Sequence, residues 1–208
     1  MWYIAMQKEC RQIQIAKTKD ENGQPIKPMF VRKRTAADRG KVIPSKIVLA
    51  LKIKNGQIQR FKARWVACGN FEKEGANGTY RKGDVAVPVL QSNDAKLIMT
   101  IAARSNPPLE VGIFDISAAY LYGRSERPIL LRIPAGMTVA EGNQDVVLGQ
   151  AGEPISQDAE RVRRNHVIEV NGNIYGLHSA GAIFNKTLSR ELQKQGFRQC
   201  RYNTCLYV

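Results

Sequence analysis

The segment over residues 46–68 constrains the fold most, because two runs of strand-forming residues meet at Asn55-Gly56. Asn-Gly between alternating apolar runs is the strongest short signal for a β-hairpin, since both residues tolerate the positive φ of a type I′ turn. Side chains alternate between the two faces of a strand. The predicted apolar face carries Ile47, Leu49, Leu51, Ile53, Phe61, Ala63, Trp65 and Ala67. The opposite face carries the cations Lys46, Lys52, Lys54, Arg60, Lys62 and Arg64.

The six cations on one strand face repel one another unless an anion lies against them. The whole chain shares this bias, with 32 Lys and Arg against 18 Asp and Glu and a net charge of +14 over 208 residues. A polyphosphate or a nucleic-acid backbone is therefore the favoured partner of the basic face, and an acidic membrane surface is second. A solvated face of a basic protein is the alternative.

Targeting and redox features point to the cell interior. No apolar run reaches the roughly 18 residues of a membrane span, and the first residues lack the layout of a signal peptide. We therefore expect no membrane association and an intracellular, cytoplasmic protein, with the nucleus as an alternative. The cysteines and histidines are too scattered for a zinc site, so free and mostly buried thiols are expected. They are Cys10, Cys68, Cys200, Cys205, His166 and His178.

The N-terminal part is predicted to hold a short amphipathic helix over residues 1–11, followed by an exposed basic loop over residues 17–41. We expect an N-terminal unit of helix and mobile connector over residues 1–45 and a main domain over residues 46–208. Residues 139–164 are polar and rich in Gly and Gln, which predicts a long loop or insertion within that domain.

The main domain mixes predicted helices with hairpins. Ser92 or Asn93 is expected to cap a helix that ends at Arg104, and a buried strand should follow over residues 109–114. Another strand is predicted over residues 129–133, and a second Asn-Gly pair, at 171–172, should join strands 167–170 and 173–175. A last helix is expected over residues 180–195, stopped by Gly196. The side chains predicted to face inward from the two helices are Leu97, Ile98, Ile101, Ala102, Ile183, Phe184, Leu188 and Leu192.

Asp115 stands at the predicted end of the buried strand. A carboxylate held there by a sheet can bind a hard cation such as Mg²⁺. Caps and turns use Asp at the same kind of position, so a structural role remains the alternative.

A series of segments in the order and at the rough spacing seen here resembles the reverse transcriptases of Ty1/copia-type retrotransposons. The segments are residues 2–9, 43–46, 60–69, 87–89, 114–123, 132–137 and 174–177. The resemblance covers nearly the whole chain, and its specificity lies in the ordered series rather than in one motif.

The resemblance implies an α+β fold of fingers plus partial palm, with an antiparallel sheet and packed helices. It also implies RNA- or DNA-templated DNA synthesis with two Mg²⁺ ions, and a primer–template and a dNTP as partners. Asp115 resembles the first metal-binding Asp, with the backbone carbonyl of Ile116 as an extra ligand. Tyr120 resembles the aromatic residue that stacks under the sugar, and Lys62 and Arg64 occupy the hairpin that contacts the triphosphate. On the remaining basic face, we expect nucleic-acid contacts from Lys46, Lys52, Lys54 and Arg60.

The chain also departs from the pattern. The family continues to a Tyr-x-Asp-Asp hairpin that these 208 residues do not contain, and the only adjacent acidic pair, Asp20-Glu21, lies in the N-terminal connector. Residues 177–184 lack the Gln, Pro, Arg and Trp of the family's Leu-Lys-Gln-Ala-Pro-Arg-Ala-Trp run, and Asn203 stands where Asp is usual. We therefore expect the isolated chain to be inactive as a polymerase. A non-enzymatic nucleic-acid-binding remnant and a reading frame without function are the alternatives.

Overall fold

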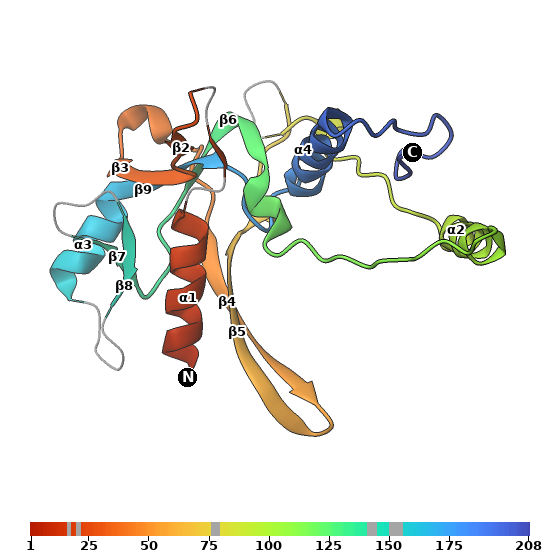
Figure 1. Ribbon diagram of the computed structural model, residues 1–208. Helices are drawn as coiled ribbons and strands as arrows, with labels where there is room; N and C mark the ends of the chain where they lie inside the picture. The colour runs from red at the N-terminus through yellow and green to blue at the C-terminus, as the bar shows by residue number, and fades with distance from the viewer. Residues whose placement is uncertain (16–17, 20–21, 76–79, 141–144, 150–155) are drawn as a thin grey trace.

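A three-stranded antiparallel sheet lies at the centre of the fold (Figure 1). The computed structural model describes residues 1–208 apart from 16–17, 20–21, 76–79, 141–144 and 150–155. In the sheet, β9 (His166–Gly172) pairs on one side with β3 (Met29–Lys33) and on the other with β6 (Arg124–Leu131). Because β9 is the middle strand, Val167, Ile168 and Val170 are all buried, on both of its faces.

Helix α1 (Trp2–Gln14) packs against the strand β5 (Gln57–Ala67) and against β8 (Val146–Leu148), which pairs with β7 (Met137–Val139). Cys10 and Ile13 place its apolar side in the core. The Cys10 thiol donates a hydrogen bond of 3.3 Å to the carbonyl of Val146, and the Gln14 amide bonds both backbone groups of the same residue. The predicted N-terminal helix is confirmed and runs three residues further.

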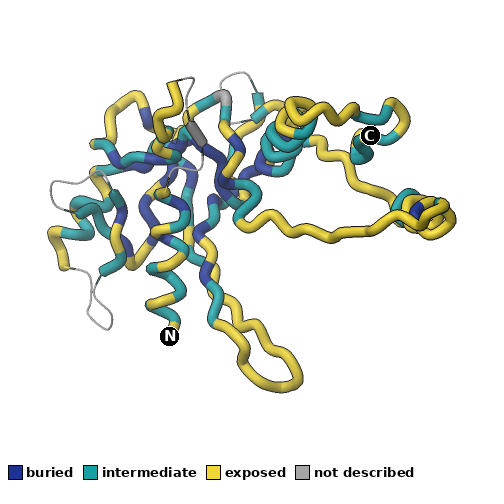
Figure 2. Tube along the Cα trace, in the orientation of Figure 1, coloured by how far each residue is buried: buried dark blue, intermediate teal, exposed yellow. Residues whose placement is uncertain are grey.

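The predicted hairpin is confirmed as β4 (Ser45–Lys54) and β5 (Gln57–Ala67), which project from the body (Figure 1). Asn55 and Gly56 have φ values of 53° and 74°, as a type I′ turn requires. Figure 2 shows the base of the hairpin buried and its tip exposed. On the predicted apolar face Trp65 and Ala67 are buried, whereas the outer side chains Leu49, Leu51 and Ile53 are exposed.

The prediction of a loop over residues 17–41 is wrong where β3 lies. This strand is at the edge of the central sheet, with Met29 and Val31 buried. Two further residue pairs form a small ladder, β1 (Thr18–Lys19) with β2 (Pro25–Ile26). The apolar alternation in β3 covers only five residues and is flanked by Pro28 and by cations, so the sequence signal was weak.

The second Asn-Gly pair is not a turn, because Asn171 and Gly172 both lie in β9 and Gly172 pairs with Arg124. The backbone N–H groups of Asn171 and Gly172 donate to the carbonyl of Pro28, and a Cβ at Gly172 would lie 3.2 Å from the Pro28 ring. This glycine therefore permits a close approach of two chain segments. The strand predicted over 173–175 is absent.

Helix α2 (Ser92–Arg104) ends at Arg104 as the sequence predicts, but it begins before the predicted start, with Gln91 and not Ser92 or Asn93 as its N-cap. It stands away from the body at the end of two extended arms (Figures 1 and 2), so only Ala102 of its predicted buried stripe is buried. Residues 109–114 form one of these arms, and the buried strand predicted there is wrong: Ile113 and Phe114 are 89% and 92% exposed. Among the described residues no strand lies beside this arm to pair with it.

Residues 139–164 are not only a loop, since they contain β8 and most of α3 (Gln157–Asn165), which Ser156 caps through a bond from the backbone N–H of Ala159. Parts of that prediction, 141–144 and 150–155, lie outside the described residues. The last helix is confirmed as α4 (Ala180–Lys194), followed by Gly196 at a φ of 94°. Short 3₁₀ turns occur at Ala36–Asp38, Gly69–Phe71, Lys82–Asp84 and Ala119–Tyr122.

The fold is therefore of the α+β class, with antiparallel sheets and packed helices. Across the described part of the chain, every helix is too short or too polar to cross a bilayer.

Candidate nucleic-acid and nucleotide groove

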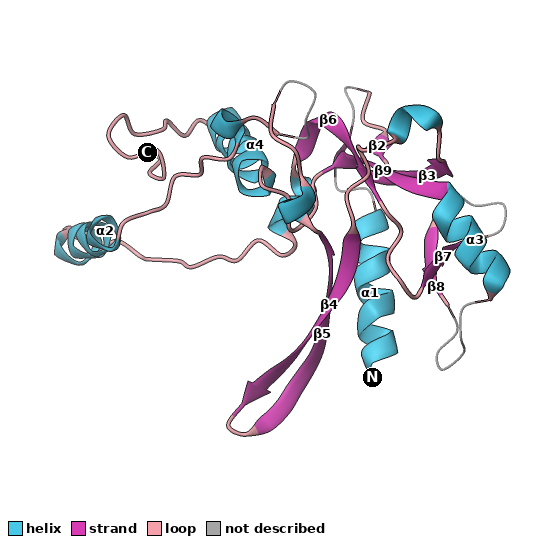
Figure 3. Cartoon of the chain, turned by 180° about the vertical axis from the view of Figure 1, so that it is seen from behind, coloured by secondary structure: helices cyan, strands magenta, loops and turns pink. Residues whose placement is uncertain are grey.

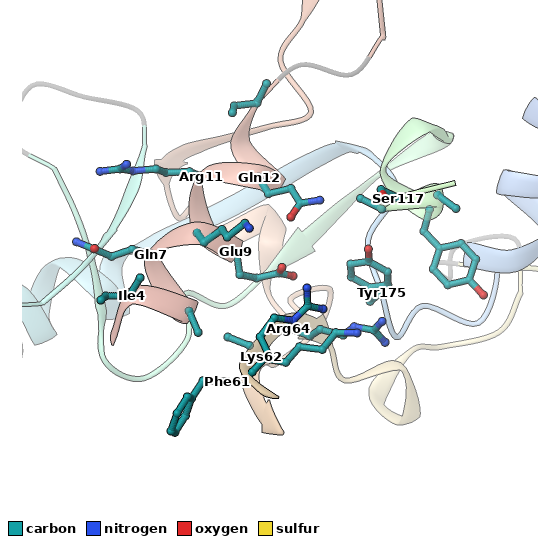
Figure 4. A pocket seen from close by; sticks show the side chains of 18 of the residues that line it. Ile4, Gln7, Glu9, Arg11, Gln12, Phe61, Lys62, Arg64, Ser117 and Tyr175 are labelled. Atoms are coloured by element: carbon teal, nitrogen blue, oxygen red, sulfur yellow. The ribbon is translucent and has the colours of Figure 1, made fainter. Parts of the chain in front are cut away.

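A groove of about 900 Å³ lies between α1, the hairpin strand β5 and the segment over residues 115–120 (Figure 4). These three segments are far apart in the sequence. Six residues predicted from the sequence as site residues line it: Arg60, Lys62, Arg64, Asp115, Ile116 and Tyr120. Lys46, Lys52 and Lys54 are not part of this lining.

The strand β5 supplies the cations of the groove. Cross-strand pairing of Val48 with Arg64, Ala50 with Lys62 and Lys52 with Arg60 places these cations on one face, as predicted. Burial lowers the pKa of Lys62, and the neighbouring charges of Arg64, Arg60 and Lys52 lower it further. Both causes disfavour the charged ammonium, and an anion in the groove would offset the repulsion among these cations.

Arg64 is additionally held by an aromatic ring. Its guanidinium carbon lies 5.2 Å from the centroid of the Tyr175 ring, within the range of a cation–π contact. Tyr175 follows β9 and lines the same groove, and its carbonyl accepts a hydrogen bond of 2.8 Å from the backbone N–H of Ala67. The base of β5 is thereby tied to the segment that leaves the central sheet.

Glu9 of α1 also lines the groove, and the sequence assigned it no role. Its Oε1 accepts a hydrogen bond of 3.1 Å from the backbone N–H of Trp65. Burial raises the pKa of Glu9, although that hydrogen bond and the charges of Arg64 and Lys62 act in the opposite direction. The one signal in the sequence is the position of Glu9 beside Cys10 and one turn before Ile13, on the apolar side of the helix.

Tyr120 forms a wall of the groove from the short turn Ala119–Tyr122. Ala118 before it adopts a left-handed conformation, with φ 56° and ψ 35°, which is uncommon for a residue with a Cβ. The Tyr120 ring packs edge-on against Tyr175 at 5.6 Å and Phe184 at 6.1 Å. These contacts fix a half-buried aromatic surface beside the cations.

Asp115 lies in the same groove, but not as predicted, because it stands on an exposed arm instead of at the end of a buried strand. Within the described residues, no hydrogen bond or ion pair holds its carboxylate. The sheet therefore gives Asp115 no rigid support.

The donor groups of the groove do not fit a pair of magnesium ions. Its lining includes two carboxylates, Glu9 and Asp115, and Glu9 already accepts the N–H of Trp65. Nowhere in the described part of the chain do three His, Cys, Asp or Glu side chains gather as a metal site. Because Mg²⁺ prefers octahedral coordination by oxygen, these residues alone would hold two ions weakly.

Comparison with protein families identifies the class to which this chain belongs. A family model described as reverse transcriptase (RNA-dependent DNA polymerase) matches residues 34–208. The chain therefore belongs to the reverse transcriptase family of the Ty1/copia type. Comparison with curated proteins and with solved structures found no match.

Proposed function

We propose that the chain forms the fingers and partial palm of an RNA-directed DNA polymerase and that its groove binds a dNTP against a primer–template. The observation that carries the proposal is the convergence of Lys62 and Arg64 with Asp115 and Tyr120 in one groove. In this proposal residues 46–208 supply fingers and palm, and residues 1–45 add α1 and β3 to the same core. Such a role belongs in the cytoplasm or the nucleus.

Different residues of the groove would contact different parts of the ligands. Lys62 and Arg64 would neutralise the triphosphate, because guanidinium and ammonium groups bind phosphate oxygens directly. Tyr120 offers a fixed ring edge or face to the sugar. On the same hairpin face, Lys46, Lys52, Lys54 and Arg60 would contact the backbone of the primer–template.

Catalysis needs more than the described residues supply. The family reaction joins a primer 3′-hydroxyl to the α-phosphate of a dNTP and releases pyrophosphate. Because Asp115 and Glu9 do not form a two-ion site, we propose that the isolated chain binds its ligands without extending primers.

Binding is the first test. A fluorescent primer–template should bind with micromolar or weaker affinity, and the affinity should fall steeply as salt rises, because backbone phosphates supply most of it. Lys62→Ala with Arg64→Ala should weaken both primer–template and dNTP binding. Lys186→Ala with Arg190→Ala, which removes the same charge from the exposed side of α4, is the matched control. Equal losses in the two double variants would show that the groove is not the site.

Primer extension on an RNA template with Mg²⁺ is the second test. The wild-type chain and an Asp115→Ala variant should both be inactive. Extension by the wild type that is lost in Asp115→Ala would contradict the proposed inactivity and would require carboxylates from outside the groove described above.

A non-enzymatic nucleic-acid-binding protein is the second candidate, and the small number of groove carboxylates favours it. The two functions differ in dNTP binding. A binding protein would retain primer–template affinity through the hairpin cations and would bind a dNTP no better than inorganic triphosphate, whereas a polymerase groove would prefer the dNTP through Tyr120.

A further inference from the structure

A second basic surface lies where α3 meets the ends of β3, β6 and β9. Two hollows of about 740 Å³ and 350 Å³ adjoin there and share Arg34, Arg164 and His166, so they form one continuous depression. We call it the α3 hollow. The cationic and titratable side chains that line it are Lys33, Arg34, Arg132, Arg161, Arg163, Arg164 and His166.

The α3 hollow is separate from the groove. Figures 1 and 3 show α3 on the far side of α1 from the hairpin β4–β5 in both views. The linings of the groove and of the hollow have no residue in common. A ligand of the hollow would therefore not compete directly for the positions of Lys62 and Arg64.

Most of the positive charge in the hollow is uncompensated. Arg163 forms an ion pair with the carboxylate of Glu160 and donates a hydrogen bond to the carbonyl of Ile133. Arg164 lies 3.4 Å from the carboxylate of Glu160. The carboxylate among the lining residues is that of Asp158. Four exposed cations form no ion pair with any residue that the structure describes: Lys33, Arg34, Arg132 and Arg161.

The backbone holds this charge in place without a ligand. The N–H of Arg34 donates a 2.8 Å hydrogen bond to the carbonyl of Asn165, and Lys33 pairs with His166 across β3 and β9. The Nδ1 of His166 lies 2.8 Å from the carbonyl of Val162, so this ring nitrogen donates to the carbonyl and the ring is oriented by α3. Like charges gathered on one surface repel one another, and an anion bound there relieves the repulsion.

We propose that the α3 hollow is a second contact site for the phosphodiester backbone of a nucleic acid. Its cations are spread over two adjoining hollows, which suits several phosphates in a row better than one small anion. No Phe, Tyr or Trp stands among its described lining residues, so it offers backbone contacts without base stacking. The site adds to the proposed groove and does not depend on it.

The test uses a variant with Arg34→Ala, Arg161→Ala and Arg164→Ala, compared with a control that carries Lys186→Ala, Arg190→Ala and Arg198→Ala. The control removes the same charge from exposed positions on and after α4. Binding of fluorescent single-stranded oligonucleotides of increasing length is measured against salt. The hollow variant should lose about tenfold or more in affinity for long oligonucleotides, and the salt slope should fall by about 2, whereas the control should change little.

Equal losses in the hollow and control variants would overturn the proposal, as would affinity that does not rise with oligonucleotide length or equally good competition by poly-glutamate of the same charge. Length-independent competition by inorganic phosphate would instead mark a small-anion site and also overturns it. Arg161→Ala alone, on the exposed side of α3, provides the same comparison if the triple variant does not fold. The groove is tested apart, because dNTP binding should be unchanged in the hollow variant and lost in Lys62→Ala with Arg64→Ala.

Discussion

The Glu9 carboxylate accepts a 3.1 Å hydrogen bond from the backbone N–H of Trp65, on the edge of β5 that faces away from β4. Two residues further along the same edge, the backbone N–H of Ala67 donates a hydrogen bond to the carbonyl of Tyr175. An unpaired strand edge is a site for unwanted pairing, so these two bonds close it where it enters the body. They also hold α1 beside the strand that carries Lys62 and Arg64.

At neutral pH the Glu9→Gln variant should be more stable than the wild type, whereas in acid the two should be similarly stable. Burial raises the pKa of Glu9 above its ordinary 4.5, so the folded state binds the proton more tightly than the unfolded state. The contribution of this carboxyl is therefore fully present below pH 4.5 and is lost as pH rises through the raised pKa. Gln keeps an acceptor for the Trp65 N–H and cannot ionise. Thermal unfolding of both proteins across this range measures the effect.

Glu9→Ala is the control for the hydrogen bond. It leaves the Trp65 N–H without an acceptor, which costs about 1–3 kcal/mol at every pH. A Glu9→Gln variant as unstable as Glu9→Ala would show that the charge, and not the acceptor, stabilises the contact.

Gly69→Ala should destabilise the chain strongly, because a Cβ there would lie 2.1 Å from the carbonyl oxygen of Gly176. The Gly176 carbonyl belongs to the backbone and can move only with its segment. The substitution should therefore cost about 1–3 kcal/mol or more. Gly83→Ala is the matched control, since nothing lies within 4 Å of its added Cβ and its φ is not positive. Urea unfolding of the two variants gives the comparison, and equal midpoints would contradict the close packing of the hairpin base on residue 176.

The parts of the fold that the sequence predicts well are those with local signals. The hairpin β4–β5 needs only the φ preferences of Asn55 and Gly56 and the alternation of the flanking strands. The second Asn-Gly pair has the same local chemistry, yet Gly172 lies inside β9 because Pro28 approaches its backbone. That approach joins residues far apart in the chain, so no local pattern reveals it.

In the candidate site too, the residues with a local signal are predicted well and those that depend on tertiary packing are not. Lys62 and Arg64 share a face by strand alternation, which is local, so the sequence predicts them correctly as neighbours. The sequence predicts a buried strand that supports Asp115. An apolar run shows that a segment is hydrophobic but not whether a neighbouring strand pairs with it. In the structure this run is an exposed arm. Glu9 and the α3 hollow depend on how α1 and α3 pack, and composition alone does not show that packing.

Asp38→Asn should weaken the chain at neutral pH and remove part of its sensitivity to acid. Asp38 is buried, accepts two hydrogen bonds from Arg32 and further bonds from Thr35, and these hold its pKa well below the ordinary 3.8. The stabilisation is therefore present above pH 3.8 and is lost as pH falls toward the lowered pKa. Loss of hydrogen bonds to a charged group costs about 1.5–3 kcal/mol. Denaturant unfolding at neutral and acidic pH measures the difference, which should shrink in acid.

Glu110→Gln is the control for that change, because Glu110 is an exposed carboxylate on the arm. It should alter the free energy of unfolding by less than about 0.5 kcal/mol at any pH. A gap between Asp38→Asn and the wild type that stays constant from neutral to acidic pH would contradict the role of the Asp38 charge.

Among the four free cysteines, Cys10 should react last with a thiol reagent in the folded chain. Burial raises the pKa of Cys10 to about 11, the residue is 5% exposed, and its thiol donates to the carbonyl of Val146. Because the thiolate is the reactive form, a pKa of about 11 in place of 9.0 leaves about 100-fold less of it at neutral pH. Cys68, Cys200 and Cys205 are half-buried and should be labelled first, as mass spectrometry of timed samples can show.

The same labelling reports whether α1 stays docked. Glu9→Ala removes one of the bonds that hold this helix on β5, so local opening should become more frequent and Cys10 should react faster, while the other three cysteines keep their rates. Equal acceleration of all four thiols would indicate global destabilisation instead. Labelling of Cys10 as fast as that of Cys200 in the unaltered chain would contradict the packing of α1 against β8.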